Sequence, residues 1–331
     1  MQHRSPLVAR GLLAAGLGLA ACTGSAGADD GATTAGDASS TADPQATADD
    51  TAGSSSGRVL MVVAYNDTWW PEYKVMLEGL EAAGYEVEVR SSTDGAVAHV
   101  YGDRVDEVTP GLVGVDPVPY EDFRARFAAS FGAPWDPAWN EPAAIPLDGR
   151  VQDAVMGDYV SLVIPGGSGS QHFRYDGDYE DLPSPIDPAH VSPAADMESA
   201  AAAIQQLVID ALIQGSPVLA VCHAGPTPGF ARVPGTQGQG PDGLGLSLLA
   251  GRRATGFPLD IEVFGARGDV AEQYAALGIE FLPQQVVVVD GPELDLDGDG
   301  TLDGAGLVVT ARSWYPEEVV QGLRTMLDRL E

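Results

Sequence analysis

Basic residues are scarce in this sequence of 331 residues: 17 Lys and Arg stand against 48 Asp and Glu, which gives a formal net charge of −31 at pH 7. Six Asp and two Arg precede residue 58, which leaves about −27 on the remainder. Such a surface repels nucleic acid and anionic lipid headgroups, so the composition excludes a nucleic-acid partner. We attribute the charge to solubility or salt adaptation and not to a charge-specific partner.

Cysteine is nearly absent, with only Cys22 and Cys222 in the chain. Two cysteines cannot build a disulfide framework, and if Cys22 carries a lipid, Cys222 has no partner in an envelope compartment where structural cysteines usually pair. An unpaired thiol there favours a chemical role. A buried, inert cysteine is the alternative.

The apolar stretch 11–20 is too short to stay in a bilayer as a helix, and Arg4 and Arg10 precede it, as in an export signal that is cleaved. Leu-Ala-Ala-Cys at 19–22 has the order of a bacterial lipobox, which predicts a lipoprotein signal over 1–22 and a lipid on Cys22. An ordinary secretory signal ending near Ala21 is the alternative. We expect a protein of the bacterial cell envelope, periplasmic or outer-surface, that contacts the membrane only through its N-terminal lipid.

Aromatic residues are missing from 23–57, which consists almost entirely of Ala, Thr, Ser, Gly and Asp. Such a segment cannot bury enough apolar surface to fold, so we interpret it as a disordered tether. No second linker of this kind interrupts 58–331, which we expect to form one domain with loop insertions.

Strand and helix patterns alternate along this domain. The run 58–64 is continuously apolar, as in a parallel strand buried on both faces; 71–83 has helical spacing, and 85–90 alternates as a second strand. Further strands are expected at 159–164, 218–221, 286–289 and 307–310, and helices at 197–214 and 316–330. This order predicts an α/β fold, a doubly wound and mostly parallel sheet between helices, of the flavodoxin-like kind. Regions rich in Gly, Pro and Asp are expected to form surface insertions: 95–150, 171–196 and 230–246.

The segment 217–225 places Cys222 and His223 directly after an apolar strand and before small residues, as in a nucleophile elbow. At the carboxyl edge of a sheet, a following helix N-terminus and nearby donors can lower a thiol pKa. We therefore predict Cys222 as a nucleophile and His223 as its base, with a structural histidine as the alternative for His223.

An earlier strand ends in Ile-Pro-Gly-Gly at 164–167, where the backbone can approach a substrate closely. The N–H groups of Gly166 and Gly167, together with that of His223, are candidates to stabilise a developing oxyanion. Alone, such a segment is more often a simple turn; the Cys-His pair about 55 residues downstream makes the prediction specific.

With these motifs the chain resembles the PfpI/ThiJ superfamily, which is related to the type 1 glutamine amidotransferase domain. The resemblance spans nearly all of 58–331 and is closest to the chaperone/glyoxalase III branch. The motifs that carry it are Val-Leu-Met-Val-Val-Ala (59–64), Leu-Val-Ile-Pro-Gly-Gly (162–167), Val-Leu-Ala-Val-Cys-His (218–223), Gly-Arg-Arg-Ala-Thr-Gly-Phe-Pro (251–258), Val-Asp-Gly (289–291) and Leu-Val-Val-Thr-Ala-Arg (307–312).

The resemblance implies four catalytic residues. Cys222 matches the nucleophile, His223 its base, Glu72 the acid on the first helix, and Glu262 the acid that orients the histidine. A carboxyl group beside a thiolate is held partly protonated by like charge and burial, which suits Glu72 to proton shuttling. The alternatives are a helix N-terminal acid for Glu72 and a surface acid for Glu262.

The sequence departs from the family pattern in two places. Ala224, Pro226 and Pro228 follow the Cys-His pair where the family has Gly and an Ala-rich helix, so the helix and its dipole are expected to be displaced or shortened. Ser168 stands where this branch commonly has His. Because no histidine follows His223, the His-x-Glu of true glutamine amidotransferases is missing, and ammonia transfer from glutamine is not expected.

A separate motif of alternating carboxylates with Gly300 at its turn can wrap oxygens around Ca²⁺. Its candidate ligands are Asp295, Asp297, Asp299, Thr301 and Asp303. Gly306 stands where an EF-hand needs its bidentate Glu, so we expect a structural calcium staple between two strands, or else a metal-free acidic turn.

Two kinds of function fit the sequence. The first is a cysteine enzyme without a catalytic cofactor that acts on a small carbonyl or amide substrate, by glyoxalase III-like conversion of a 2-oxoaldehyde to a 2-hydroxy acid, or by amidase or peptidase hydrolysis. The second is a non-catalytic envelope protein that binds, chaperones or senses redox state. Whether the domain works as a homodimer stays open.

Overall fold

The computed structural model describes residues 57–95, 97–101, 143–184, 188–257, 269–289, 294–312 and 316–330. The chain divides into two units, Met1–Thr51 and Ala52–Glu331, and all described residues lie in the second. No helix in the described ranges is both long and apolar enough to span a membrane.

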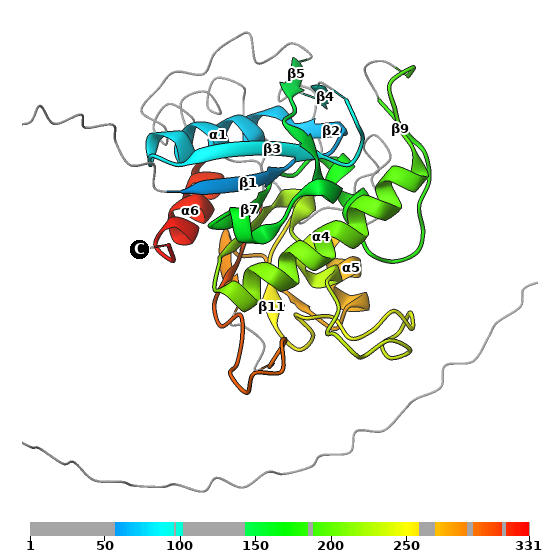
Figure 1. The fold of residues 1–331 in the computed structure, drawn as a ribbon, viewed down its shortest axis with the longest axis vertical. Helices are drawn as coiled ribbons and strands as arrows, with labels where there is room; N and C mark the ends of the chain where they lie inside the picture. The colour runs from blue at the N-terminus through cyan, green and yellow to red at the C-terminus, as the bar shows by residue number, and fades with distance from the viewer. Residues whose placement is uncertain are drawn as a thin grey trace, which may run out of the picture. The chain divides into compact units, whose positions relative to one another are not determined.

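A seven-stranded sheet forms the centre of this unit (Figure 1). Its strands in spatial order are β13 (Val286–Val289), β14 (Val308–Ala311), β10 (Val218–Val221), β7 (Ser161–Ile164), β1 (Arg58–Val62), β3 (Glu86–Ser91) and β6 (Gly149–Arg150). All neighbours pair in parallel except β13 and β14, which are antiparallel. The predicted α/β class with a mostly parallel sheet is confirmed.

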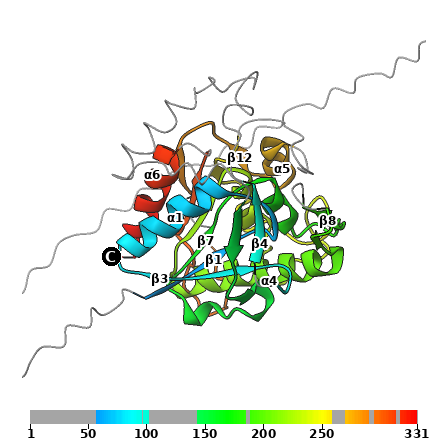
Figure 2. The same cartoon turned by 90° about the horizontal axis from the view of Figure 1, so that it is seen from above.

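Helices cover both faces of the sheet (Figure 2). Helices α1 (Trp70–Ala82) and α6 (Pro316–Leu327) contact each other, and between them they pack on β3, β10 and β14, whereas α4 (Ala194–Gln214) packs on β7 and β10. Helix α4 ends where Gly215 adopts a φ of 78°, a left-handed conformation that favours glycine. The apolar residues of β1 from Val59 to Val62 are fully buried, as expected for a strand covered on both faces.

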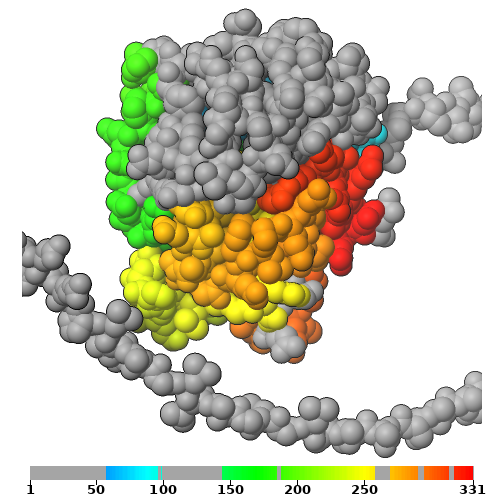
Figure 3. All heavy atoms as spheres, turned by 180° about the vertical axis from the view of Figure 1, so that it is seen from behind, coloured from blue at the N-terminus to red at the C-terminus, as the bar shows by residue number. Residues whose placement is uncertain are grey.

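Smaller elements surround the sheet. They are β2 (Asn66–Trp69), β4 (Val97–Tyr101) and β5 (Ala143–Pro146) in one sheet, β8 (Leu182–Pro183) with β9 (Val191–Ser192), β11 (Arg253–Ala254) with β12 (Glu280–Phe281), and helix α5 (Val270–Ala276). Figure 3 shows the yellow and orange segment that holds β11, α5 and β12 lying beside the red C-terminal residues. Parts of the expected insertions 95–150 and 171–196 therefore form short strands.

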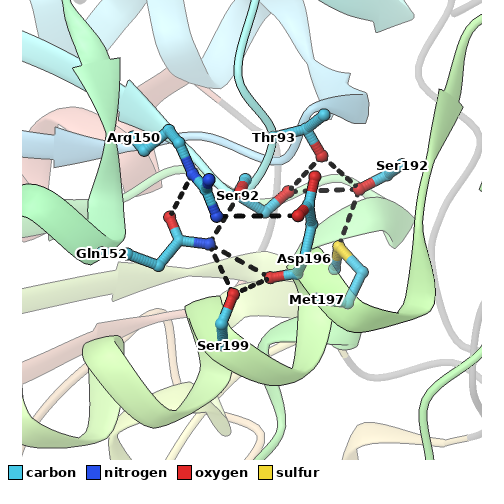
Figure 4. A network of polar contacts seen from close by, with 8 residues as sticks. All are labelled: Ser92, Thr93, Arg150, Gln152, Ser192, Asp196, Met197 and Ser199. Carbon is cyan, nitrogen blue, oxygen red and sulfur yellow. Dashed lines mark hydrogen bonds and ion pairs between the residues drawn. The ribbon is translucent and has the colours of Figure 1, made fainter.

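A buried network of polar side chains anchors the start of α4 at the carboxyl end of β3 (Figure 4). The hydroxyls of Ser92, Thr93 and Ser192 lie 2.9–3.4 Å from one another. The Gln152 amide donates to Ser92 O and to Ser199 Oγ, each at 2.8 Å. These bonds fix the insertion that carries β9 against the edge of the sheet where the parallel strands end.

Candidate active site

Cys222 directly follows β10 and turns the chain sharply at the carboxyl edge of the sheet. Its φ is 58°, and only Asp67 shares a positive φ among the described residues other than glycine. A non-glycine residue with a positive φ has a strained backbone, and structures tolerate such strain mainly at functional sites. The Cys222 backbone thus has the strained geometry expected of a nucleophile elbow.

Three groups surround the sulfur atom. The backbone N–H groups of Gly167 and His223 lie near the Cys222 thiol and act to lower its pKa, and Nδ1 of His223 lies 3.5 Å from Sγ. Gly167 can approach so closely because its φ of 104° suits glycine. The N–H groups of Gly167 and His223, two of the three predicted oxyanion donors, therefore lie near the sulfur atom, and their oxyanion role stays a prediction.

Glu72 enters the site from the first turn of α1 and is fully buried. Its Oε2 accepts a hydrogen bond from Gly166 N at 2.6 Å, and its carboxyl group interacts with the Cys222 thiol. Its Oε1 is buried without a donor in good geometry among the described residues, which is a costly arrangement outside a functional site. The Gly166 N–H thus holds the Glu72 carboxyl group in this structure, and the role of Gly166 as an oxyanion donor stays a prediction.

Burial keeps the titratable groups of the site neutral. It raises the pKa of Glu72 to about 8, against the smaller lowering effects of Cys222 and Gly166, and it lowers the pKa of His223 to about 4. Burial, reinforced by the neighbouring Glu72, raises the pKa of the Cys222 thiol well above its ordinary range. At pH 7 the resting site holds a thiol, a neutral imidazole and a protonated carboxyl group.

The expected lowering of the thiol pKa by a following helix is therefore wrong. The residues after Cys222 form two short 3₁₀ turns, Cys222–Ala224 and Thr227–Phe230, in place of an α-helix. Pro226 and Pro228 cannot continue a helical hydrogen-bond ladder, as the departure from the family pattern suggested. Only two local N–H groups remain to stabilise a thiolate, and burial outweighs them.

The Thr-Gly-Phe segment at 255–257 packs against the backbone of Cys222 and the ring of His223. Phe257 N donates to Cys222 O at 3.0 Å, and the Phe257 ring lies 4.4 Å from the His223 ring, centroid to centroid. A Cβ on Gly256 would come within 2.9 Å of the same Cys222 carbonyl, so this position has no room for a side chain. Glu262, the predicted orienting acid, lies outside the described residues, as does Cys22.

The predicted calcium ligands lie in the hairpin between β13 and β14. Ligand atoms of Asp295, Asp297 and Asp303 lie within 4.8 Å of one another. The Asp299 carboxylate instead accepts hydrogen bonds from Thr301 N at 2.7 Å and Thr301 Oγ1 at 2.5 Å. The structure brings three of the five predicted ligands together and pairs the other two with each other.

No protein-family model matches this sequence, and no curated protein matches it either. Among solved structures, a two-domain protein with DJ-1/ThiJ/PfpI-like and ferritin-like domains from Anabaena variabilis aligns at 18% identity and a TM-score of 0.43, over 83% of this chain and 48% of that one. A ThiJ/PfpI domain protein from Brachyspira murdochii aligns at 12% identity and a TM-score of 0.45, over 82% and 96%. Glyoxalase III from Candida albicans aligns at 19% identity and a TM-score of 0.42, over 84% of this chain and 99% of that one.

This chain thus spans about half the length of the two-domain Anabaena protein. At these identities and TM-scores, the similarities carry no conclusion about chemistry. What this chain can do follows from its own residues.

Replacing Glu72 with glutamine should stabilise the protein at neutral pH. The Glu72 carboxyl group has a pKa of about 8 in the folded protein and an ordinary value of 4.5 in the unfolded chain. Its contribution to stability is fully present below pH 4.5 and is lost as the pH rises towards 8, because in this range only the unfolded chain releases the proton. Glutamine cannot titrate, so at pH 7 it should relieve a cost on the order of 3 kcal/mol.

Thermal unfolding from pH 5 to pH 8 measures this effect. The wild-type Tm should fall relative to that of Glu72→Gln, while Glu81→Gln, an exposed position on the same helix, should follow the wild type. Parallel pH profiles for the wild type and Glu72→Gln would contradict a protonated Glu72.

Proposed function

We propose that this chain is a PfpI/ThiJ-type enzyme that converts 2-oxoaldehydes to 2-hydroxy acids through a covalent adduct on Cys222, without glutathione or a catalytic cofactor. One observation carries the proposal. Cys222 has a strained backbone, its thiol lies near the N–H groups of Gly167 and His223, and the buried, protonated Glu72 lies beside it. A nucleophile, an oxyanion site and an acid thus meet at one atom.

These protonation states suit a reaction that begins from a neutral thiol. As Sγ adds to the aldehyde carbon, His223 Nδ1 takes the thiol proton, and Glu72 gives its own proton to the carbonyl oxygen. The Glu72 carboxylate then removes the hydrogen of the former aldehyde carbon and returns it to the adjacent carbon, while the hydroxyl proton of the adduct passes to the neighbouring oxygen. The product is the thioester of a 2-hydroxy acid. Water hydrolyses the thioester and restores the thiol. The net change adds one water to the substrate and needs no external oxidant or reductant.

The same residues allow a second reaction, the hydrolysis of an amide or peptide through an acyl-cysteine. The Gly167 and His223 N–H groups would stabilise its tetrahedral intermediate. The unpartnered Oε1 of Glu72 favours the 2-oxoaldehyde reaction, because the hydroxyl of a hemithioacetal can donate to it. A purely binding, chaperone or redox-sensing role is the third candidate.

A substrate panel on the full chain separates these functions. We expect steady consumption of methylglyoxal with formation of lactate, and little hydrolysis of small amides or a casein peptide mixture. Amide hydrolysis without lactate would replace the first proposal by the second. Inactivity on both, with equal methylglyoxal binding by the wild type and Cys222→Ser, would leave only a binding role.

We also propose that the hairpin between β13 and β14 holds a structural Ca²⁺ on Asp295, Asp297 and Asp303. The convergence of three carboxylates supports this site, since calcium prefers such oxygens. The ion would tie the hairpin together and take no part in the reaction at Cys222.

Calcium at about 100 times its Kd should stabilise the wild type by about 2.7 kcal/mol, a rise in Tm of several degrees. Asp297→Ala should lose this rise, whereas Asp299→Ala, whose carboxylate bonds Thr301, should retain most of it. Thermal unfolding with EDTA or calcium measures both. No calcium shift in the wild type would refute the site.

We propose, finally, that the protein is anchored to the bacterial envelope by a lipid on Cys22. The lipobox order at 19–22 and the polar tether composition of 23–57 support this location. Mass spectrometry of the mature N-terminal peptide, with Cys22→Ala as the control, would detect the lipid or show an unmodified end.

A further inference from the structure

Asp67 and Cys222 are the two described non-glycine residues with positive φ, at 63° and 58°. Cys222 directly follows β10, whereas Asp67 lies in β2, a few residues after the end of β1; the carboxyl ends of β1 and β10 meet at the same edge of the sheet. Asp67 is only 3% exposed and contributes neither to the core nor to the mechanism above. The register of the β2–β4 pairing shifts between Asn66 and Thr68, so Asp67 is the extra residue of this irregularity, a local geometry that can re-aim a side chain beside a site.

The Gly166–Gly167 segment lies between these two residues. A Cβ on Gly166 would come within 2.7 Å of Cys222 Cβ, and one on Gly167 would overlap Asp67 O and lie 2.5 Å from Trp69 N. Trp69 N also donates to Gly166 O at 3.0 Å. The backbone beside Asp67 is thus the surface against which the Gly-Gly segment rests.

The Asp67 side chain binds Ser168, the residue that follows the Gly166–Gly167 segment. Ser168 Oγ donates a hydrogen bond to Asp67 Oδ2, and Ser168 is itself only 5% exposed. Gly167 therefore packs closely against the Asp67 backbone, and the residue that follows it is bonded to the Asp67 side chain. The Gly167 N–H, like that of His223, lies near the Cys222 thiol and acts to lower its pKa.

We propose that Asp67 is a positioning residue that, through Ser168, holds the Gly167 N–H against Cys222 Sγ. The proposal rests on the proposed role of Cys222 as the nucleophile and concerns the donor that stabilises its charge. In this role Asp67 acts on the sulfur atom only through Ser168 and Gly167. Burial, which raises the Asp67 pKa, makes its pairing with the Ser168 hydroxyl the favourable arrangement for this carboxyl group.

Three substitutions in the full chain separate the parts of this arrangement. Asp67→Gly keeps the positive φ and removes the acceptor; Ser168→Ala removes the donor; Asp67→Asn keeps an acceptor and tolerates the left-handed conformation. Ser91→Ala is the control, because Ser91 Oγ donates to Val63 O at the same sheet edge without touching the Gly-Gly segment.

The readout is the pH profile of iodoacetamide alkylation at Cys222, followed by peptide mass spectrometry. Asp67→Gly and Ser168→Ala should each raise the apparent thiol pKa by about one unit, about tenfold less thiolate at a given pH. The double variant should be no worse than either single one, because the two residues form one interaction. Asp67→Asn and Ser91→Ala should follow the wild type.

Unchanged thiol pKa values in both Asp67→Gly and Ser168→Ala would overturn the proposal, as would fully additive effects in the double variant. Because alkylation needs no substrate, this outcome is independent of the proposed reaction. A wild type inactive on methylglyoxal that still shows the pKa shifts would disprove the reaction and retain Asp67. A wild type that is active on methylglyoxal, with variants that show no pKa shift, would retain the reaction and disprove the role of Asp67.

Discussion

Cys222→Ser should lower the turnover of methylglyoxal by at least about 10³-fold, because catalysis through a covalent adduct cannot proceed without its nucleophile. A serine hydroxyl is far less acidic than a thiol, and this site already disfavours charge strongly enough to raise the thiol pKa. His223, whose pKa burial lowers to about 4, is the same base in both proteins and does not offset this difference in acidity. Initial rates of lactate formation, at saturating and at low substrate, measure the loss.

The same substitution should hardly affect folding. Oxygen replaces sulfur without changing the backbone, so the φ of 58° and the hydrogen bond from Phe257 N to Cys222 O can persist. A Tm close to that of the wild type, together with retained substrate binding, would assign the loss to chemistry. If Cys222→Ser keeps most of the turnover, the adduct mechanism is wrong.

Gly166→Ala should destabilise the protein by about 2–3 kcal/mol and also abolish turnover. A Cβ there would come within 2.5 Å of Glu72 Oε2, 2.7 Å of Cys222 Cβ and 2.7 Å of Val221 O. None of the three can move freely, since Val221 O is backbone and the two side chains are fixed in the site. The methyl group must therefore separate the acid from the nucleophile or shift a central strand.

Gly157→Ala is a matched control, because a Cβ at that glycine meets nothing within 4 Å and its φ is not in the strained range. It should change the free energy of unfolding by less than about 0.5 kcal/mol and leave turnover intact. Urea unfolding of both variants makes the comparison. Equal stability and activity of Gly166→Ala and the wild type would contradict the packing described at Cys222.

The sequence predicted the buried strands well because each is a continuous apolar run. The predicted 218–221 and 286–289 coincide with β10 and β13, and 58–64 contains β1. Parts of the insertions were harder to predict. Strand β4 pairs with β2 on one side and with β5 on the other, and such long-range pairing leaves little trace in local composition. The start of α4 lies at Ala194, three residues before the predicted 197.

The site was predictable where strand ends and motifs define it. Cys222, His223 and Glu72 come together, and Gly167 supplies its N–H. Two properties depended on packing that no local pattern encodes: the burial that raises the thiol pKa, and the capture of the Gly166 N–H by Glu72. Asp67 was missed because the sequence gives no sign of β2, nor of the positive φ of Asp67 and its bond to Ser168.

The most direct measurement of the central claim follows methylglyoxal and the mass of Cys222 together, using the full-length protein without glutathione. We expect lactate to accumulate over many turnovers while a substrate-derived adduct appears on the Cys222 peptide, and both to vanish after prior alkylation of Cys222. Lactate formation that survives alkylation, or an adduct without any lactate, would contradict the account.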